Sequence, residues 1–110
     1  MSRRYEVRLT ASADRDLDEL YAYIAQNRSP DEAHHLIAEL LDRMAPLEHY
    51  PDRGSVPPEL AALGEQGFRQ ILQLPYRIIY ERAGDIVWVY VVADGRRDMQ
   101  TLLSQRLLSP

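Results

Sequence analysis

The chain has 110 residues, 45% of them hydrophobic, which is enough for one domain with a core and too few for two ordinary ones. Its 13 basic residues are all arginine and face 17 acidic ones, and the net charge of −4 excludes a protein that coats nucleic acid over its whole surface, so any basic site must be local. The absence of lysine and cysteine excludes mechanisms that need a lysine amine or a cysteine thiolate. Because the sequence has no apolar run long enough to span a membrane and no apolar signal-peptide centre, we expect a cytoplasmic protein.

The first elements are predicted to be a strand and a helix. Apolar and polar residues alternate over 5–9, which is the period of a half-buried strand. From Ala13 to Ile24 apolar residues recur three and four positions apart, the spacing of one helical face. The helix also carries acidic residues that we expect to be solvated charges on its outer face rather than an acid–base pair, namely Asp14, Asp16, Asp18 and Glu19.

A second helix is predicted to begin at a capping box. Ser29 is suited to be the N-cap, Pro30 occupies the first helical position, and Glu32 stands at the third. The apolar stripe that follows reaches Leu47, although Pro46 should kink or fray the last turn because it has no backbone N–H. Two amphipathic helices joined by so short a link predict an antiparallel hairpin with one shared apolar side.

The second half of the chain is predicted to be mostly sheet. Residues 50–67 are rich in proline and glycine, with room for one or two helical turns over 58–63. Three stretches of β-branched and aromatic residues follow, at 68–74, 76–82 and 86–93. The links between these stretches are so short that only hairpins can join them, which predicts an antiparallel meander. The last strand has no polar alternation, so we expect it to be buried on both faces and central in the sheet. With Asp98 capping a short helical tail, the fold class is α+β in the order β-α-α-β-β-β.

The sequence offers no recognisable cofactor or metal site. The loop from Gly64 to Gly67 lacks the spacing of a nucleotide-binding fingerprint. His34 and His35 are adjacent on a helix and point about 100° apart, so they cannot share a metal ion. We therefore predict no cofactor, no metal and no catalytic residue.

Charge is distributed unevenly along the chain. Residues 31–67 carry 2 arginines and 8 acids, whereas residues 68–110 carry 6 arginines and 4 acids. Arg69 and Arg77 lie on neighbouring predicted strands, and Arg96–Arg97 follow the central one, so their guanidinium groups could converge on one face or edge of the sheet. The alternative is that they simply fringe its exposed side.

Six segments carry a family resemblance that spans almost the whole chain. They are residues 5–9, 16–25, 29–30, 47–54, 76–80 and 95–98. In this order they resemble the RelE/ParE toxin superfamily, whose members are toxins of type II toxin–antitoxin pairs. The resemblance implies one toxin domain over residues 1–110 and an antitoxin that holds it inactive.

The superfamily has two biochemical branches. RelE-like members cut messenger RNA in the ribosomal A site, which requires cationic residues for the phosphate and a tyrosine or histidine near the C-terminus for proton transfer. Arg77 and Arg97 resemble two of that branch's arginines, but no Tyr, His, Lys or Glu follows Arg97, and Leu103 stands where the tyrosine would be. ParE-like members instead bind and block DNA gyrase, and the hairpin, the 47–54 segment and Gly95–Asp98 look like that branch.

The resemblance therefore favours a ParE-like gyrase inhibitor, a plasmid-stabilization type of toxin that binds rather than catalyses. A ribosome-dependent endoribonuclease and an inactive, interaction-only homologue remain the alternatives. The implied partners are DNA gyrase and a ParD-like antitoxin in a hetero-oligomer, with no membrane and no sequence-specific nucleic acid. The candidate target contacts are Arg69, Arg77, Arg96, Arg97, Met99, Leu102 and Leu103. The candidate antitoxin contacts are Leu17, Tyr21, Ile24, Leu36 and Leu40.

Overall fold

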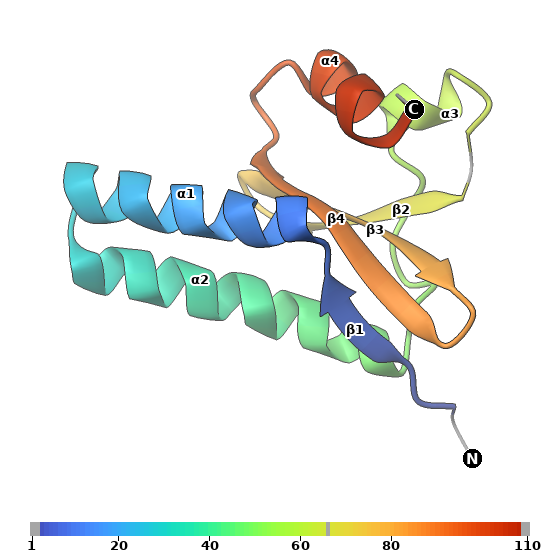
Figure 1. Ribbon diagram of the computed structural model, residues 1–110, viewed down its shortest axis with the longest axis horizontal. Helices are drawn as coiled ribbons and strands as arrows, with labels where there is room; N and C mark the ends of the chain where they lie inside the picture. The colour runs from blue at the N-terminus through green and yellow to red at the C-terminus, as the bar shows by residue number, and fades with distance from the viewer. Residues whose placement is uncertain (1–2, 66, 109–110) are drawn as a thin grey trace.

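The element order agrees with the predicted plan. A computed structural model describes residues 3–65 and 67–108. Figure 1 shows a helical hairpin beside a sheet, with short helices over the far side of the sheet. The elements are β1 (Glu6–Leu9), α1 (Ala11–Asn27), α2 (Pro30–Met44), a 3₁₀ turn (Ala45–Glu48), α3 (Pro58–Ala61), β2 (Phe68–Gln73), β3 (Tyr76–Ala83), β4 (Ile86–Asp94), α4 (Met99–Leu103) and a π-helical turn (Ser104–Leu108).

Side-chain caps fix where the helices begin. Thr10 accepts from the backbone N–H of Ala13 at 3.1 Å, and Ser29 accepts from that of Glu32 at 3.0 Å. The predicted capping box is only half formed, because the Glu32 carboxylate lies 3.7 Å from Arg28 instead. The helix α2 gives way to the 3₁₀ turn at Ala45, which confirms the predicted effect of Pro46.

The sheet has the order β1-β4-β3-β2, so β4 is central, as predicted. The meander β2-β3-β4 is antiparallel, whereas β1 pairs with β4 in parallel. A bulge interrupts the β3–β4 ladder: Ile79 pairs with Val91 and Tyr80 with Val89, which leaves Tyr90 extra. The bulge lets Tyr90 and Val91 pack on the same side of the sheet.

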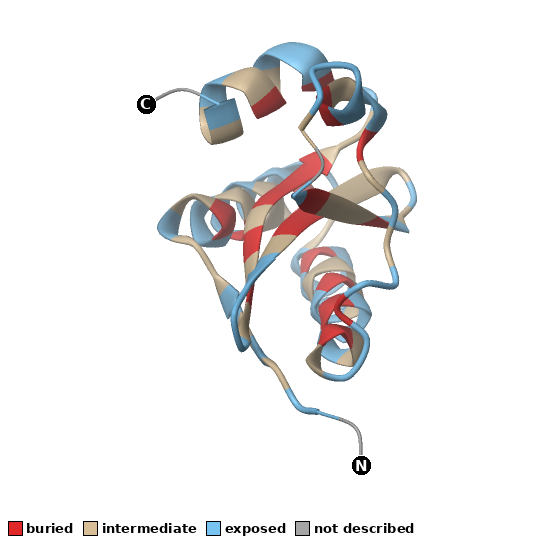
Figure 2. Ribbon diagram, turned by 90° about the vertical axis from the view of Figure 1, so that its right-hand side faces the viewer, coloured by how far each residue is buried: buried red, intermediate tan, exposed pale blue. Residues whose placement is uncertain are grey.

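Each face of the sheet has its own apolar core, and Figure 2 shows buried residues on the strands and along the inner side of the hairpin. The hairpin α1–α2 covers one face, where Leu17, Leu40 and Ile78 are buried together. The helices α3 and α4 cover part of the other face, where Leu60, Ile79 and Leu103 are buried. None of the described helices is long and apolar enough to cross a bilayer.

Candidate functional site

A groove of about 1140 Å³ lies between the helical hairpin and the end of the sheet. One wall is the far half of α1 and the first turns of α2, and the other is the β2–β3 turn with the end of β4 and the residues that follow it. In Figure 1 the hairpin extends past the sheet on the left, which leaves these two walls facing each other. The volume of the groove is slightly above the range of about 300–1,000 Å³ that is typical of small-molecule pockets.

Large apolar side chains are exposed along this groove. Leu74 on the β2–β3 turn is 79% exposed and Tyr23 on α1 is 64% exposed. Half-buried Leu36 and buried Ile24 lie between the hairpin and the sheet in the same lining. Apolar side chains gathered in one hollow are typical of a surface that a partner covers.

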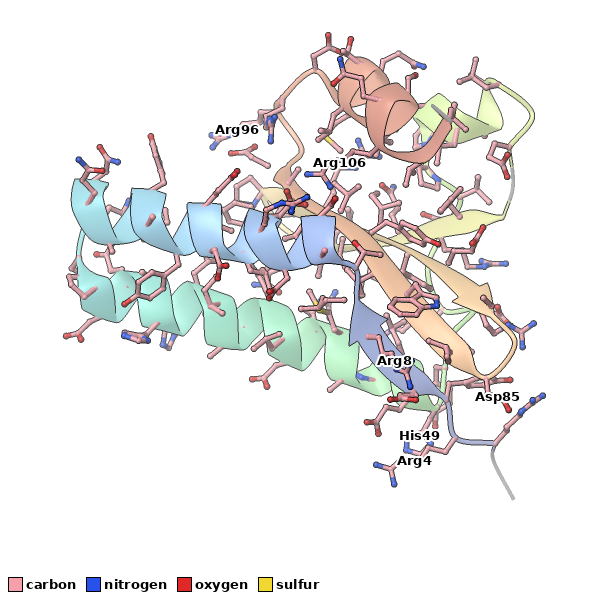
Figure 3. All side chains as sticks on the ribbon, in the orientation of Figure 1. Arg4, Arg8, His49, Asp85, Arg96 and Arg106 are labelled. Atoms are coloured by element: carbon pink, nitrogen blue, oxygen red, sulfur yellow. The ribbon has the colours of Figure 1, made fainter. Side chains whose placement is uncertain are left out.

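The two walls differ in charge. The hairpin wall carries Glu19 and Asp31, neither of which has an ion-pair or hydrogen-bond partner for its carboxylate among the described residues. The opposite wall carries Arg96 and Arg97 (Figure 3 labels Arg96). Arg28 also lies on the hairpin wall, 3.7 Å from Glu32, and Asp94 lies on the opposite wall, bound to Arg96. The groove is therefore net acidic on one side and net basic on the other, which favours a partner with the complementary arrangement.

Arg96 and Arg97 differ in how free they are. The Arg96 guanidinium is tied to Asp94, with Nη2 to Oδ2 at 2.6 Å and Nε to Oδ1 at 3.0 Å. This hydrogen bonding lowers the pKa of Asp94 below its ordinary value. Within residues 3–65 and 67–108, the Arg97 guanidinium has no such partner, and the side chain is exposed. A partner can therefore pair with Arg97 without breaking an existing ion pair, whereas Arg96 would first have to leave Asp94.

Arg77 is held by a bidentate ion pair. Its Nη1 and Nη2 donate to the Glu59 carboxylate at 2.8 and 2.7 Å, and its Nε donates to Gln70 Oε1 at 2.8 Å. The two side chains are 12% and 21% exposed. The pairing lowers the pKa of Glu59, so the carboxylate is ionised beside the guanidinium. Arg77 links β3 to α3 rather than facing the groove.

The structure does not bring the predicted arginines together. Arg69 pairs in register with Tyr80, on the face that α1 and α2 cover, and donates to the carbonyl oxygens of Asp52 and Gly54 at 3.2 and 2.7 Å. Arg77 pairs with Ala93, on the opposite face. Because alternate residues of a strand point to opposite faces, these two guanidinium groups cannot converge. Of the four arginines, only Arg96 and Arg97 line the groove.

Several predicted contact residues belong to the two cores instead. Leu17, Leu40, Met99 and Leu103 are 6%, 0%, 3% and 0% exposed, so their side chains pack inside the protein. Leu102 and Tyr21 are half-buried, and the Tyr21 hydroxyl lies 2.9 Å from His34 Nε2 on the hairpin. Ile24 and Leu36 are the members of the predicted antitoxin set that line the groove.

One prediction about α1 is wrong. Asp16 is not a solvated charge: its side chain is 9% exposed, and its Oδ2 accepts from the backbone N–H of Val92 at 3.0 Å. Its Oδ1 pairs with Arg106, which Figure 3 shows reaching from the C-terminal segment toward α1. Arg106 also donates to the Tyr90 carbonyl oxygen at 3.1 Å. Asp16 thus fixes the C-terminal segment against α1 and β4, because a carboxylate this buried requires such partners.

Comparison with known proteins agrees with the fold. Residues 7–99 match the model of the family described as ParE toxin of type II toxin–antitoxin system, parDE. No curated protein matches the sequence. Among solved structures, the chromosomal ParDE toxin–antitoxin system from P. aeruginosa is similar at a TM-score of 0.69 and 17% identity, covering 83% of this chain and 96% of that one. The toxin–antitoxin complex RelBE2 from Mycobacterium tuberculosis gives a TM-score of 0.58 at 23% identity, covering 83% and 98%.

Proposed function

The chain belongs to the ParE toxin family of type II toxin–antitoxin systems, and we propose that it inhibits DNA gyrase by binding and is neutralised by a ParD-like antitoxin. In this proposal the toxin acts in the cytoplasm and stabilises the plasmid or chromosomal region that encodes the pair. Its inactive form is a hetero-oligomer with the antitoxin.

The observation that carries the gyrase proposal is the exposed guanidinium of Arg97, which has no carboxylate partner among the described residues, beside a segment that lacks the tyrosine or histidine of the RelE-like branch. After Arg97 the sequence has no Tyr, His, Lys or Glu. Arginines of this kind anchor protein interfaces through bidentate hydrogen bonds. We propose Arg97, with Arg96 and the half-buried Leu102 as secondary contacts, as the gyrase-binding surface.

The endoribonuclease alternative is less well supported. In that alternative Arg77 and Arg97 hold the phosphate, yet the Glu59 carboxylate already accepts from both terminal nitrogens of Arg77. Releasing Arg77 would leave a poorly exposed carboxylate without its cation, which is costly. An inactive homologue is distinguished from both by activity assays.

We propose that the antitoxin occupies the groove. Tyr23, Ile24, Leu36 and Leu74 supply apolar contacts, and the charges of the walls favour a segment with cations toward the hairpin and a carboxylate toward Arg97. Leu74→Asp should weaken the complex with the product of the neighbouring small gene at least tenfold, because it places a charge in the apolar contact. Leu63→Asp, at a 55% exposed leucine outside the groove, is the matched control.

The gyrase proposal is tested with purified protein in a DNA supercoiling assay, run beside a messenger-RNA cleavage assay in a translation mixture. We expect inhibition of supercoiling, no messenger-RNA cleavage, and loss of inhibition in Arg97→Ala. The matched control is Arg15→Ala, which removes an exposed arginine of α1 whose guanidinium contacts only the Ser12 hydroxyl at 3.3 Å among the described groups. Equal inhibition by the two variants would refute the role of Arg97, and cleavage without gyrase inhibition would favour the endoribonuclease.

A further inference from the structure

A second hollow, of about 500 Å³, lies at the other end of the sheet from the groove. It is lined by the N-terminal segment with Arg3 and Tyr5 and by the loop from His49 to Arg53. Figure 3 shows Arg4, His49 and Asp85 at this end of the molecule. The strand β4 begins beside Asp85 and ends at Asp94 in the groove, so about 30 Å separate the two hollows at the usual rise of a strand.

The loop from His49 to Arg53 has exposed side chains that its packing against the sheet does not require. Pro51 is buried, and the N–H of Gly54 donates to the Tyr80 hydroxyl at 3.1 Å. A side chain at Gly54 would collide with the Gln70 carbonyl oxygen, so the close approach of the loop to β2 requires glycine. Tyr50, in contrast, is 66% exposed and Arg53 is exposed, and neither contributes to this packing.

Arginines outnumber carboxylates around the hollow. Four carboxylates near the hollow already have cationic partners: Asp85 is paired with Arg3, Glu6 lies 2.7 Å from Arg8, Glu48 lies 3.4 Å from Arg4, and Asp52 lies 3.8 Å from Arg69. Two further guanidinium groups, those of Arg53 and Arg82, have no carboxylate partner in the part of the chain that the structure describes. This end of an acidic protein is therefore locally basic and can attract an anion.

Aromatic rings stand beside these cations. Arg82 donates to the Tyr5 hydroxyl at 3.1 Å, and its guanidinium carbon lies 5.5 Å from the centre of the Tyr5 ring, with that of Arg3 at 5.3 Å. Tyr5 thus holds both guanidinium groups at the edge of the hollow. The exposed rings of His49 and Tyr50 meet edge to face, with centroids 6.3 Å apart. Exposed rings next to unpaired arginines are the combination that binds unstacked bases together with their phosphates.

We propose that this hollow binds a short single-stranded segment of nucleic acid without sequence preference. A base stacks on the exposed ring of Tyr50, and the adjoining phosphates contact Arg53 and Arg82. A duplex is a poorer ligand because the ring faces of its bases are covered by their neighbours. The proposal does not depend on gyrase inhibition, since it concerns the free toxin at a separate end of the sheet.

The test is fluorescence anisotropy of a labelled ten-nucleotide single strand of mixed sequence, titrated with the full chain at several salt concentrations. Tyr50→Ala should weaken binding by about fivefold or more, the loss of one stacked base, without changing the salt dependence, and Tyr50→Phe should bind as the unaltered protein does. Arg53→Ala should weaken binding and lower the slope of log affinity against log salt by about 0.7, one phosphate contact on a single strand.

Arg15→Ala, on the outer side of α1, is the control for the loss of one positive charge and should change affinity little. All these side chains are exposed, and unchanged unfolding temperatures verify that the variants fold. The proposal is overturned by absence of saturable binding at low salt, by equal affinities of Tyr50→Ala and the unaltered protein, or by a preference for a duplex of the same length. Binding of an acidic peptide with the same dependence on Tyr50, but of no oligonucleotide, would identify a protein partner and overturn it as well.

Discussion

Glu59→Ala should cost the protein about 2 kcal/mol of its free energy of unfolding. The variant leaves the Arg77 guanidinium with only its hydrogen bond to Gln70, in a side chain that is 12% exposed. Removing one partner of a fully buried ion pair costs about 3–5 kcal/mol, whereas an exposed pair contributes about 0.2–1 kcal/mol. The pair is intermediate in exposure and bidentate in geometry, which places the loss between these limits. At about 4 °C per kcal/mol for a chain of this size, the unfolding temperature should fall by roughly 8 °C.

The effect of Glu59→Ala should depend on pH in a defined direction. The hydrogen bonds from Arg77 lower the pKa of Glu59 in the folded protein below its ordinary value of 4.5. A carboxylate with a lowered pKa stabilises the folded state above the pKa of the unfolded chain, and this contribution is lost as the pH falls through the folded pKa. The difference between Glu59→Ala and the unaltered protein should therefore be full at pH 7 and shrink steadily below about pH 4.5.

Urea unfolding at pH 7 and pH 3, followed by circular dichroism, measures both quantities. Glu32→Ala is the matched control, because the Glu32 carboxylate lies 3.7 Å from Arg28 in an exposed pair and should contribute at most about 0.5 kcal/mol. The double variant Glu59→Ala/Arg77→Met should recover part of the loss, since it leaves no unpaired guanidinium. A Glu59→Ala variant as stable as Glu32→Ala, or an effect as large at pH 3 as at pH 7, would refute the reasoning.

Three further predictions concern the packing around the site. Leu40→Ala, at a side chain with 0% exposure, should lower stability by about 2–5 kcal/mol in urea unfolding, whereas a mainly antitoxin-binding role predicts little change. Asp16→Ala should cost about 2 kcal/mol and speed proteolysis within residues 99–108, because it leaves Arg106 with only its hydrogen bond to the Tyr90 carbonyl oxygen and removes the acceptor of the Val92 N–H; unchanged cleavage would contradict this. Gly54→Ala should lower the free energy of unfolding by about 1–3 kcal/mol in thermal denaturation, and an unchanged melting temperature would show that the loop tolerates a side chain.

The sequence was sufficient to predict the order of the elements because each boundary has a local signal. Ser29 and Pro30 begin α2, and the short links at Pro75 and 83–85 force the meander, so the predicted strands match the observed ones within a residue or two. The central place of β4 followed from its unbroken apolar run. These features depend on residues that are close together in the sequence, so they can be predicted without knowing the tertiary structure.

The partners of the charged residues could not be predicted in the same way. Asp16 and Arg106 come from opposite ends of the chain, and Glu59 reaches Arg77 from a loop with only one helical turn. Whether Arg69 and Arg77 share a face depends on the register of β2 against β3, in which Leu72 and not Arg69 lies opposite Arg77. Such pairings appear only when the strands are in place.

The groove was missed for a related reason. Helical periodicity identifies the stripe that is buried, so it selected Leu17 and Leu40, which fill the core. Tyr23 lies beside that stripe and Leu74 stands next to a proline in a turn, and both are exposed. An apolar residue just outside a predicted stripe is the signal that could have indicated a surface for a partner.

The parallel pairing of β1 with β4 has a consequence for how the chain folds. The α1–α2 hairpin and the β3–β4 hairpin join residues close in sequence, whereas the register of Glu6 with Ile86 joins the two ends. Contacts of such long sequence separation form late, because the loop between them must be closed first. On the ribosome, β1 has no strand partner until β4 has been synthesised, so the sheet with its two hollowed ends is complete only after that last strand has emerged.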